Sequence, residues 1–279
     1  MFFTQLRWEL FKLAARPRTW LGFGAAVLWQ LLGAGVLRLP AVRAGIAHQF
    51  HRAGLNFAEN FTGLTSSAYM LANAMTFVGS LFIALIAADL VAQEREEGTL
   101  RMIFSRPITR GRIFVLKLLV ALGYTLGFTW FVGLCGLAIG LIAEGPGRLA
   151  MVGYKESVFG VFEWSEGLWR YWLAVLLVSI SECTVALLAF AFSCLRMKPA
   201  AATVLALTVF IADDLVRNVP ALHSVRHHFL MTRVIAWVGA YNDPLHVARL
   251  RRSYSELAIF DVALAGAAWL AFRRNEFKP

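Results

Sequence analysis

Long apolar runs alternate with charged or polar segments along the entire chain. Six of these runs approach or exceed the roughly 20 residues that a helix needs to cross the hydrocarbon core of a membrane. They cover residues 19–37, 68–92, 113–143, 171–195, 200–216 and 256–272. The pattern predicts an all-α membrane protein, with residues 1–279 forming a single transmembrane domain built as a six-transmembrane-helix bundle.

Two further segments have a helical pattern without predicting a span. In residues 3–16, apolar positions such as Leu6 and Leu10 fall on the opposite face of a helix from polar positions such as Glu9. This predicts an N-terminal amphipathic helix at the membrane interface. Residues 229–240 are apolar over too short a length to cross, so we expect a short external or re-entrant helical segment before the last span.

The amino-acid composition supports a membrane location and changes how the net positive charge of the chain is interpreted. Hydrophobic residues make up 59% of the chain and charged residues 16%, and the mean hydropathy is +0.63, which is too apolar for an ordinary soluble domain. A net charge of +10 would suggest nucleic acid as the partner of a soluble protein. In a membrane protein, lysine and arginine instead mark the cytosolic side, so no nucleic-acid partner is expected.

The positions of these basic residues predict the orientation. Six spans place both termini on one side of the membrane, and 15 of the 27 lysines and arginines fall in the segments on that side, although these segments are shorter in total. We therefore expect a multi-pass protein of the inner cell membrane with both termini cytoplasmic. Arg249, Arg251 and Arg252, just before the sixth span, run against this asymmetry.

The connection between the second and third spans, residues 93–112, is compact and charged. It opens with Gln93-Glu94-Arg95-Glu96-Glu97-Gly98-Thr99-Leu100 and continues to Arg112. The pattern predicts a helix that leaves the membrane and breaks at Gly98, a second short helix through Phe104, and a turn at Pro107 that returns the chain to the membrane. Such an elbow offers a rigid surface to a partner protein.

The order of these residues, an acidic segment followed by a proline, an arginine and a lysine, resembles the segment between the second and third spans in permeases of the type-2 ABC transporter family. The matching residues are Glu94, Glu97, Gly98, Thr99, Leu100, Pro107, Arg110 and Lys117. The resemblance extends to the amphipathic N-terminal helix, the six-span layout, the helical segment before the last span and the basic end Phe272-Arg273-Arg274.

The resemblance implies that the elbow is a cytosolic coupling helix seated in a cleft of a separate nucleotide-binding subunit. The residues expected to couple to that ATPase are Glu94, Glu97, Gly98, Thr99, Leu100, Arg101, Phe104, Pro107 and Arg110. Within the same segment, apolar contact with the ATPase would come from Leu100, Met102, Ile103 and Phe104. Ion pairs with charges on the ATPase would involve Glu94, Glu97 and Arg101. A second copy of the chain or a homologous permease would complete an exporter within the membrane lipid.

The chain itself lacks the signature of an ATPase. A phosphate-binding loop needs a lysine followed by Ser or Thr, and every lysine here precedes Leu, Glu or Pro. ATP and Mg²⁺ would therefore bind only to the partner, and this chain is expected to carry no cofactor. No His-Glu-x-x-His or Gly-x-Ser-x-Gly motif occurs, so we assign no catalytic residue and no metal site and do not expect an enzyme.

Ionisable residues inside the spans suggest an alternative function. Glu182 lies near the middle of the fourth span and is a candidate pathway residue, because a buried acid is costly in hydrocarbon unless it faces protein or water. A proton-coupled secondary transporter would also place acids there, and it is the alternative to an ATP-driven exporter. We found no internal symmetry of the kind that such transporters often carry.

Three local expectations complete the picture. Lys117 is expected to extend to the headgroups from the start of the third span. Asp213 and Arg217 are expected to form an ion pair one helical turn apart. Two Gly-x-x-x-Gly pairs in the third span, Gly123 with Gly127 and Gly136 with Gly140, are expected to allow close helix packing.

Overall fold

The computed structural model describes residues 2–104, 108–153, 158–219, 221 and 229–274. It contains six helical segments that are long and apolar enough to cross a membrane, which confirms the predicted all-α membrane bundle. They are α2 (Pro17–Leu37), the continuous segment Gly63–Glu96, α8 (Arg110–Glu144), α9 (Trp164–Ser193), α10 (Pro199–Arg217) and α12 (Val247–Arg274). The second segment comprises α5 (Gly63–Ala74), a π-helical turn η1 (Met75–Gly79) and α6 (Ser80–Glu96).

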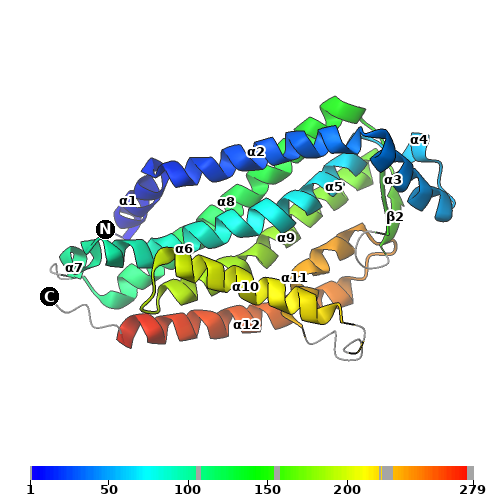
Figure 1. Ribbon diagram of the computed structural model, residues 1–279. Helices are drawn as coiled ribbons and strands as arrows, with labels where there is room; N and C mark the ends of the chain where they lie inside the picture. The colour runs from blue at the N-terminus through cyan, green and yellow to red at the C-terminus, as the bar shows by residue number, and fades with distance from the viewer. Residues whose placement is uncertain (1, 105–107, 154–157, 220, 222–228, 275–279) are drawn as a thin grey trace.

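Shorter elements cap the two ends of the bundle. The helices α1 (Phe2–Ala15) and α7 (Thr99–Phe104) lie at one end, together with the end of α12, and we call this the α7 end (Figure 1). The opposite end, which we call the hairpin end, carries α3 (Pro40–Arg52), α4 (Phe57–Asn60) and two antiparallel strands. Strand β1 (Leu149–Val152) pairs with β2 (Phe159–Phe162), with Leu149 opposite Phe162.

Proline and glycine set several helix boundaries. Pro17, Pro40 and Pro199 each occupy the first turn of a helix, where the missing N–H has no intrahelical partner to lose. Gly145 ends α8 with a positive φ of 78°, a conformation that a side chain would disfavour. These signals are local, but they do not fix every boundary: α9 begins at Trp164 and α12 at Val247, several residues before the predicted spans that start at residues 171 and 256.

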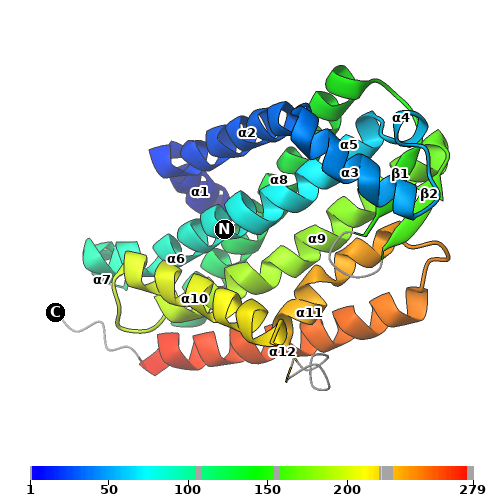
Figure 2. The ribbon, with the colours of Figure 1, turned by 45° about the vertical axis from the view of Figure 1, so that its right-hand side comes forward.

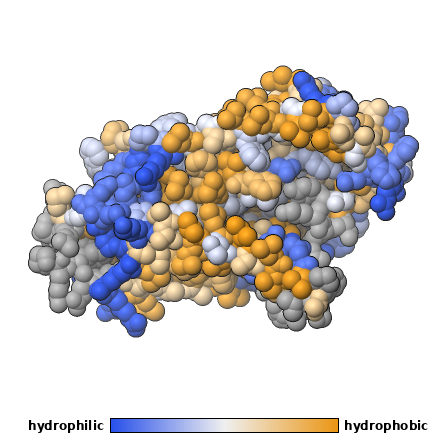
Figure 3. Space-filling model, in the orientation of Figure 1, coloured by the Kyte–Doolittle hydropathy of each residue, from blue (hydrophilic) through white to orange (hydrophobic). Residues whose placement is uncertain are grey.

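The centre of the bundle is formed by α9 and by the segment from α5 to α6, which cross beside each other in Figure 2. Within their apolar stretches, 72% of the residues of α9 and 67% of those of Gly63–Glu96 are buried, against 17% for α2 and for α12. The outer helices therefore present their apolar side chains to the surroundings. Figure 3 shows the result as a broad hydrophobic band between two more polar ends, as expected for a surface in contact with lipid.

The segment before the last span is a helix inside the bundle. α11 (Leu230–Val234) continues into the 3₁₀ helix η3 (Ile235–Tyr241), which packs on α9 while α11 contacts α9, α10 and α12. Asp213 of α10 accepts the backbone N–H groups of Leu230 and Met231, at 3.3 and 2.6 Å. The prediction of an Asp213–Arg217 ion pair is wrong. Arg217 pairs with Asp214 at 3.0 Å, and Asp213 accepts the hydrogen bonds at the start of α11 instead.

The two glycine pairs of the third span behave differently. A Cβ at Gly140 would lie 2.1 Å from Ser67 Oγ and 2.6 Å from the carbonyl oxygen of Gly63, so α5 and α8 approach too closely for any side chain there. A Cβ at Gly136 would lie 3.3 Å from the Tyr171 hydroxyl of α9 and 3.4 Å from the Gln30 amide of α2, so this glycine is closely packed as well. Around Gly123 and Gly127 there is nothing within 4 Å, so the prediction of close packing is confirmed for the second pair and wrong for the first.

Candidate functional site

The connection between α6 and α7 forms the predicted elbow. α6 ends at Glu96, and Gly98 adopts a positive φ of 75°, which reverses the chain at low steric cost. The Thr99 hydroxyl then donates to the carbonyl oxygen of Glu94 at 3.0 Å, and α7 begins at Thr99. Gly98 and Thr99 therefore shape the turn, as their residue types suggest.

A buried lysine lies directly behind this turn. Lys117 Nζ of α8 is 2.7 Å from Glu94 Oε2 and 3.4 Å from Glu9 Oε2, and it donates to the carbonyl oxygen of Leu90 at 2.8 Å. Only 1% of the Lys117 side chain and 5% of that of Glu94 are exposed. The expectation that Lys117 extends to the headgroups is wrong, because two carboxylates and a carbonyl hold it inside the protein.

The amphipathic helix α1 supplies the rest of the cluster. Lys12 Nζ lies 2.7 Å from Glu9 Oε1 and 3.8 Å from Glu94 Oε1, so charges alternate through the group of Glu9, Lys12, Glu94 and Lys117, which we call the base cluster. Burial by itself raises the pKa of Glu9, but the charge of Lys117 and the hydrogen bond from Lys12 outweigh it, and the pKa is lowered. The pKa of Lys12 is raised, because its hydrogen bond to Glu9 and the charge of Glu94 outweigh the opposing effect of burial.

Other arginines tie the α7 end of α6 and α8 to the remaining helices. Arg18 of α2 is 3.0 Å from Asp89 of α6. Arg95 donates to the carbonyl oxygen of Leu195 at 2.5 Å and to that of Met197, in the turn between α9 and α10. Arg110 donates to the carbonyl oxygen of Arg273 at 2.9 Å, so these arginines link the α7 end to α2, α12 and the turn between α9 and α10.

The outer face of the elbow is open. Glu96 and Glu97 are exposed, and Met102 of α7 exposes 65% of its surface although it is apolar. A groove of about 460 Å³ separates α7 from α1, with apolar walls that include Trp8, Ile103 and Ile108. An exposed apolar side chain beside a groove with apolar walls is typical of a protein-binding surface, and the exposed acids add a polar edge.

The predicted coupling residues therefore divide into a supporting set and an exposed set. Glu94 and Leu100 are 4% and 0% exposed, so the expectation that they contact a partner directly does not fit their positions. Glu97 and Arg110 are exposed and lie at the surface as expected. Pro107 lies outside the described residues, as do the side chains of Arg101 and Phe104.

Sequence reasoning missed the role of α1 in this site. The sequence predicted only an amphipathic helix at the membrane interface, whereas Glu9 of α1 lies 2.7 Å from Lys12 Nζ and 3.4 Å from Lys117 Nζ. The sequence did contain one signal for this role: a lysine at the start of an apolar span needs a carboxylate counter-ion when it is buried.

Glu182, the candidate pathway residue, lies in the contact between α6 and α9. Its side chain accepts from the Ser80 hydroxyl, at 3.1 Å to Oε1 and 3.2 Å to Oε2, and the residue is 4% exposed. Ser80 follows directly after the π-helical turn η1, and its Oγ also lies 3.2 Å from the carbonyl oxygen of Met75, which competes with Glu182 for the single hydroxyl hydrogen. Glu182 is thus hydrogen-bonded between two central helices.

Comparison with known proteins bears on this arrangement. Residues 5–213 match the family model described as "ABC-2 family transporter protein". The chain is also similar to "Probable ABC transporter permease protein NosY" of Stutzerimonas stutzeri, with 30% identity over 125 residues. That alignment covers 43% of this chain and 40% of the relative's length. The family match includes most of α1, the elbow and the whole base cluster.

Proposed function

Because the chain belongs to the ABC-2 family of transporter proteins, we propose that it is the permease subunit of an exporter powered by a separate ABC ATPase. The observation that carries the proposal is the elbow, whose base is held in the bundle by Lys117 and Glu94 while Glu97 and Met102 are exposed. ATP and Mg²⁺ bind to the partner, and this chain converts the partner's movement into a change of helix packing.

Force enters at the exposed face of α7 in this proposal. When two ATPase subunits close on nucleotide, the subunit bound at Glu97 and Met102 displaces α7 and the end of α6. The ion pairs of the base cluster pass this displacement to α1 and α8, because a buried pair cannot separate without leaving unpaired charge. The arginine contacts at Asp89 and at the α9–α10 turn pass it to the other spans.

The proposal includes a cytosolic α7 end and a second permease chain. α1, α7 and the end of α12 lie together, which agrees with an even number of spans and with the basic residues concentrated there. A second copy of this chain, or a homologous permease, would face the first across the pathway. The proton-coupled alternative has no comparable support, because the family is that of ABC transporters.

Co-purification tests the proposal directly. The full-length chain, isolated in mild detergent from its own membrane, is expected to retain a P-loop ATPase that mass spectrometry identifies. Replacing Glu97 by Lys together with Met102 by Asp should reduce the recovered ATPase at least tenfold, because both side chains are exposed on the elbow. Leu100 is left intact, since it is fully buried and its loss would disturb the core.

The matched control changes the same residue types at the other end of the bundle. Glu163→Lys combined with Leu39→Asp alters an exposed acid and an exposed apolar residue at the hairpin end, and ATPase recovery should stay at the wild-type level. Purification without any ATPase, or equal recovery with the elbow variant and the control variant, would contradict the proposal.

A further inference from the structure

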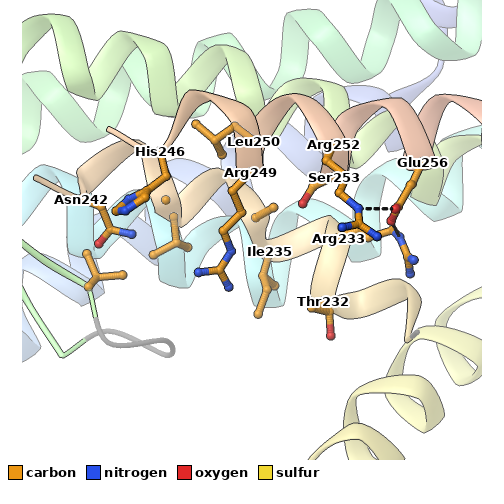
Figure 4. A pocket seen from close by; sticks show the side chains of 14 residues that line it. Thr232, Arg233, Ile235, Asn242, His246, Arg249, Leu250, Arg252, Ser253 and Glu256 are labelled. Atoms are coloured by element: carbon orange, nitrogen blue, oxygen red, sulfur yellow. Dashed lines mark hydrogen bonds and ion pairs between the residues drawn. The ribbon is translucent and has the colours of Figure 1, made fainter. Parts of the chain in front are cut away.

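A second surface feature lies at the hairpin end, far from the elbow (Figure 1). A pocket of about 580 Å³ opens between α11–η3 and the first turns of α12. Its walls are mixed: Ile235, Val238 and Leu250 are apolar, whereas Asn242 and His246 are polar. Figure 4 shows the side chain of Arg249 reaching from α12 into this space.

Positive charge predominates among the described residues of the pocket. Arg233, Arg249 and Arg252 contribute three guanidinium groups and Glu256 one carboxylate, so the described lining carries a net charge of +2 with His246 neutral. Glu256 Oε2 accepts from Arg233 Nε at 2.6 Å, and Oε1 accepts from Arg252 Nε at 3.1 Å. One carboxylate thus pairs with two of the three guanidinium groups of the pocket (Figure 4).

The depth of the pocket along α12 matches the surface of a membrane. The apolar part of α12 begins at Leu257, immediately after Glu256. Beyond it, Ile259 and Val262 expose 71% and 73% of their surface, and Phe260 exposes 36%. A positively charged pocket therefore continues, along one helix, into an apolar surface that acyl chains can cover.

We propose that this pocket binds the phosphate of an anionic phospholipid headgroup, with the acyl chains lying along α12. Guanidinium groups suit this ligand because they donate two parallel hydrogen bonds to a phosphate. The ligand also accounts for Arg249 and Arg252, which oppose the charge asymmetry expected of this side of the membrane. The site is at the opposite end from the elbow, so lipid binding here needs neither the ATPase nor its nucleotide.

Binding of short-chain lipids to the purified, delipidated full-length chain tests this proposal. Dioctanoyl-phosphatidylglycerol, dioctanoyl-phosphatidylcholine and inorganic phosphate are titrated separately by calorimetry in detergent. We expect phosphatidylglycerol to bind at least tenfold more tightly than either of the others, because only it combines a net negative charge with acyl chains. Equal binding of inorganic phosphate would assign the pocket to free anions and overturn the lipid proposal, and equal binding of phosphatidylcholine would overturn its anionic character.

Variants locate the binding. The double substitution Arg249→Gln and Arg252→Gln should weaken phosphatidylglycerol binding at least tenfold, while Arg251→Gln should not change it, since Arg251 lies on the same helix but outside the pocket lining. Glu256→Gln raises the net charge of the described lining to +3 and should strengthen binding. The same loss in the Arg251 variant as in the double variant, or weaker binding by Glu256→Gln in a protein with wild-type thermal stability, would overturn the assignment.

Discussion

The α7 end and the glycine contact of α5 with α8, near the hairpin end, are held together by different chemistry. At the α7 end, long charged side chains join the helices, as where Lys117 pairs with Glu94 and Arg18 with Asp89. In the contact around Gly140, backbone meets backbone, and neutral side chains nearby donate to carbonyl oxygens of α8. These donors are Gln30 to Val132 at 2.8 Å, Ser67 to Gly136 at 3.0 Å and Tyr171 to Gly133 at 2.7 Å.

The difference in contacts matches the mechanical role of each region under the proposed function. Charged side chains span several ångströms between backbones, and their attraction persists when the helices shift slightly. Contacts at glycine have no side chain that could adjust, so they keep α5 and α8 at one separation. We therefore interpret the α7 end as the part that receives movement and the glycine contacts as the part that resists it.

Removing the buried lysine should cause the largest change. Lys117→Met leaves Glu94 and Glu9 without their shared cation, and breaking a buried ion pair by removing one partner typically costs about 3–5 kcal/mol. Thermal unfolding of the detergent-solubilised protein, followed by tryptophan fluorescence, measures the loss. Lys198→Met, at an exposed lysine, is the control and should leave the melting temperature nearly unchanged.

A double variant sharpens this result. If Lys117 and Glu94 interact as the structure indicates, Lys117→Met with Glu94→Gln should destabilise the protein by less than the sum of the two single substitutions. Strictly additive costs would mean that the two side chains are not coupled, and the ion-paired account of the α7 end would fail.

At the hairpin end, the expected effect is smaller and has a control of opposite sign. Gly140→Ala places a Cβ against Ser67 and the backbone of Gly63, and overpacking of this kind costs about 1–3 kcal/mol. Gly127→Ala on the same helix meets nothing within 4 Å and should be neutral or stabilising, because alanine favours helix by about 0.5–1 kcal/mol over glycine. Equal melting temperatures for the two variants would contradict the close contact of α5 with α8.

The smallest expected effect concerns pH at the α7 end. The pKa of Glu9 is lowered on folding, so its ionised form stabilises the protein above the unfolded value of about 4.5, and this contribution is lost as the pH falls through the folded value. The difference in melting temperature between wild type and Glu9→Gln should be largest at pH values above about 4.5 and should shrink as the pH falls below that value. A difference that grows on acidification would contradict the lowered pKa.

Much of the elbow could be predicted from the sequence because its signals are local. Gly98 interrupts a charged helix, and only a residue that tolerates positive φ reverses the chain there easily, so the break falls where it was expected. The distribution of the coupling residues between surface and interior could not be predicted. Leu100 and Met102 are both apolar and two positions apart, yet one is fully buried and the other 65% exposed, because the rest of the protein covers only one side of α7.

The hydropathy pattern by itself determined the membrane class, the six spans and the short helix before the last one, because the length of an apolar run and the cost of polar backbone in lipid depend on the chain alone. Only the tertiary structure decided which helix faces meet. It paired Lys117 with Glu9 and Glu94, and it made Gly140 indispensable while leaving Gly127 open. The physical reason is that lipid and protein interior are both apolar, so a helix that is hydrophobic all round carries no pattern that distinguishes its lipid face from its packed face.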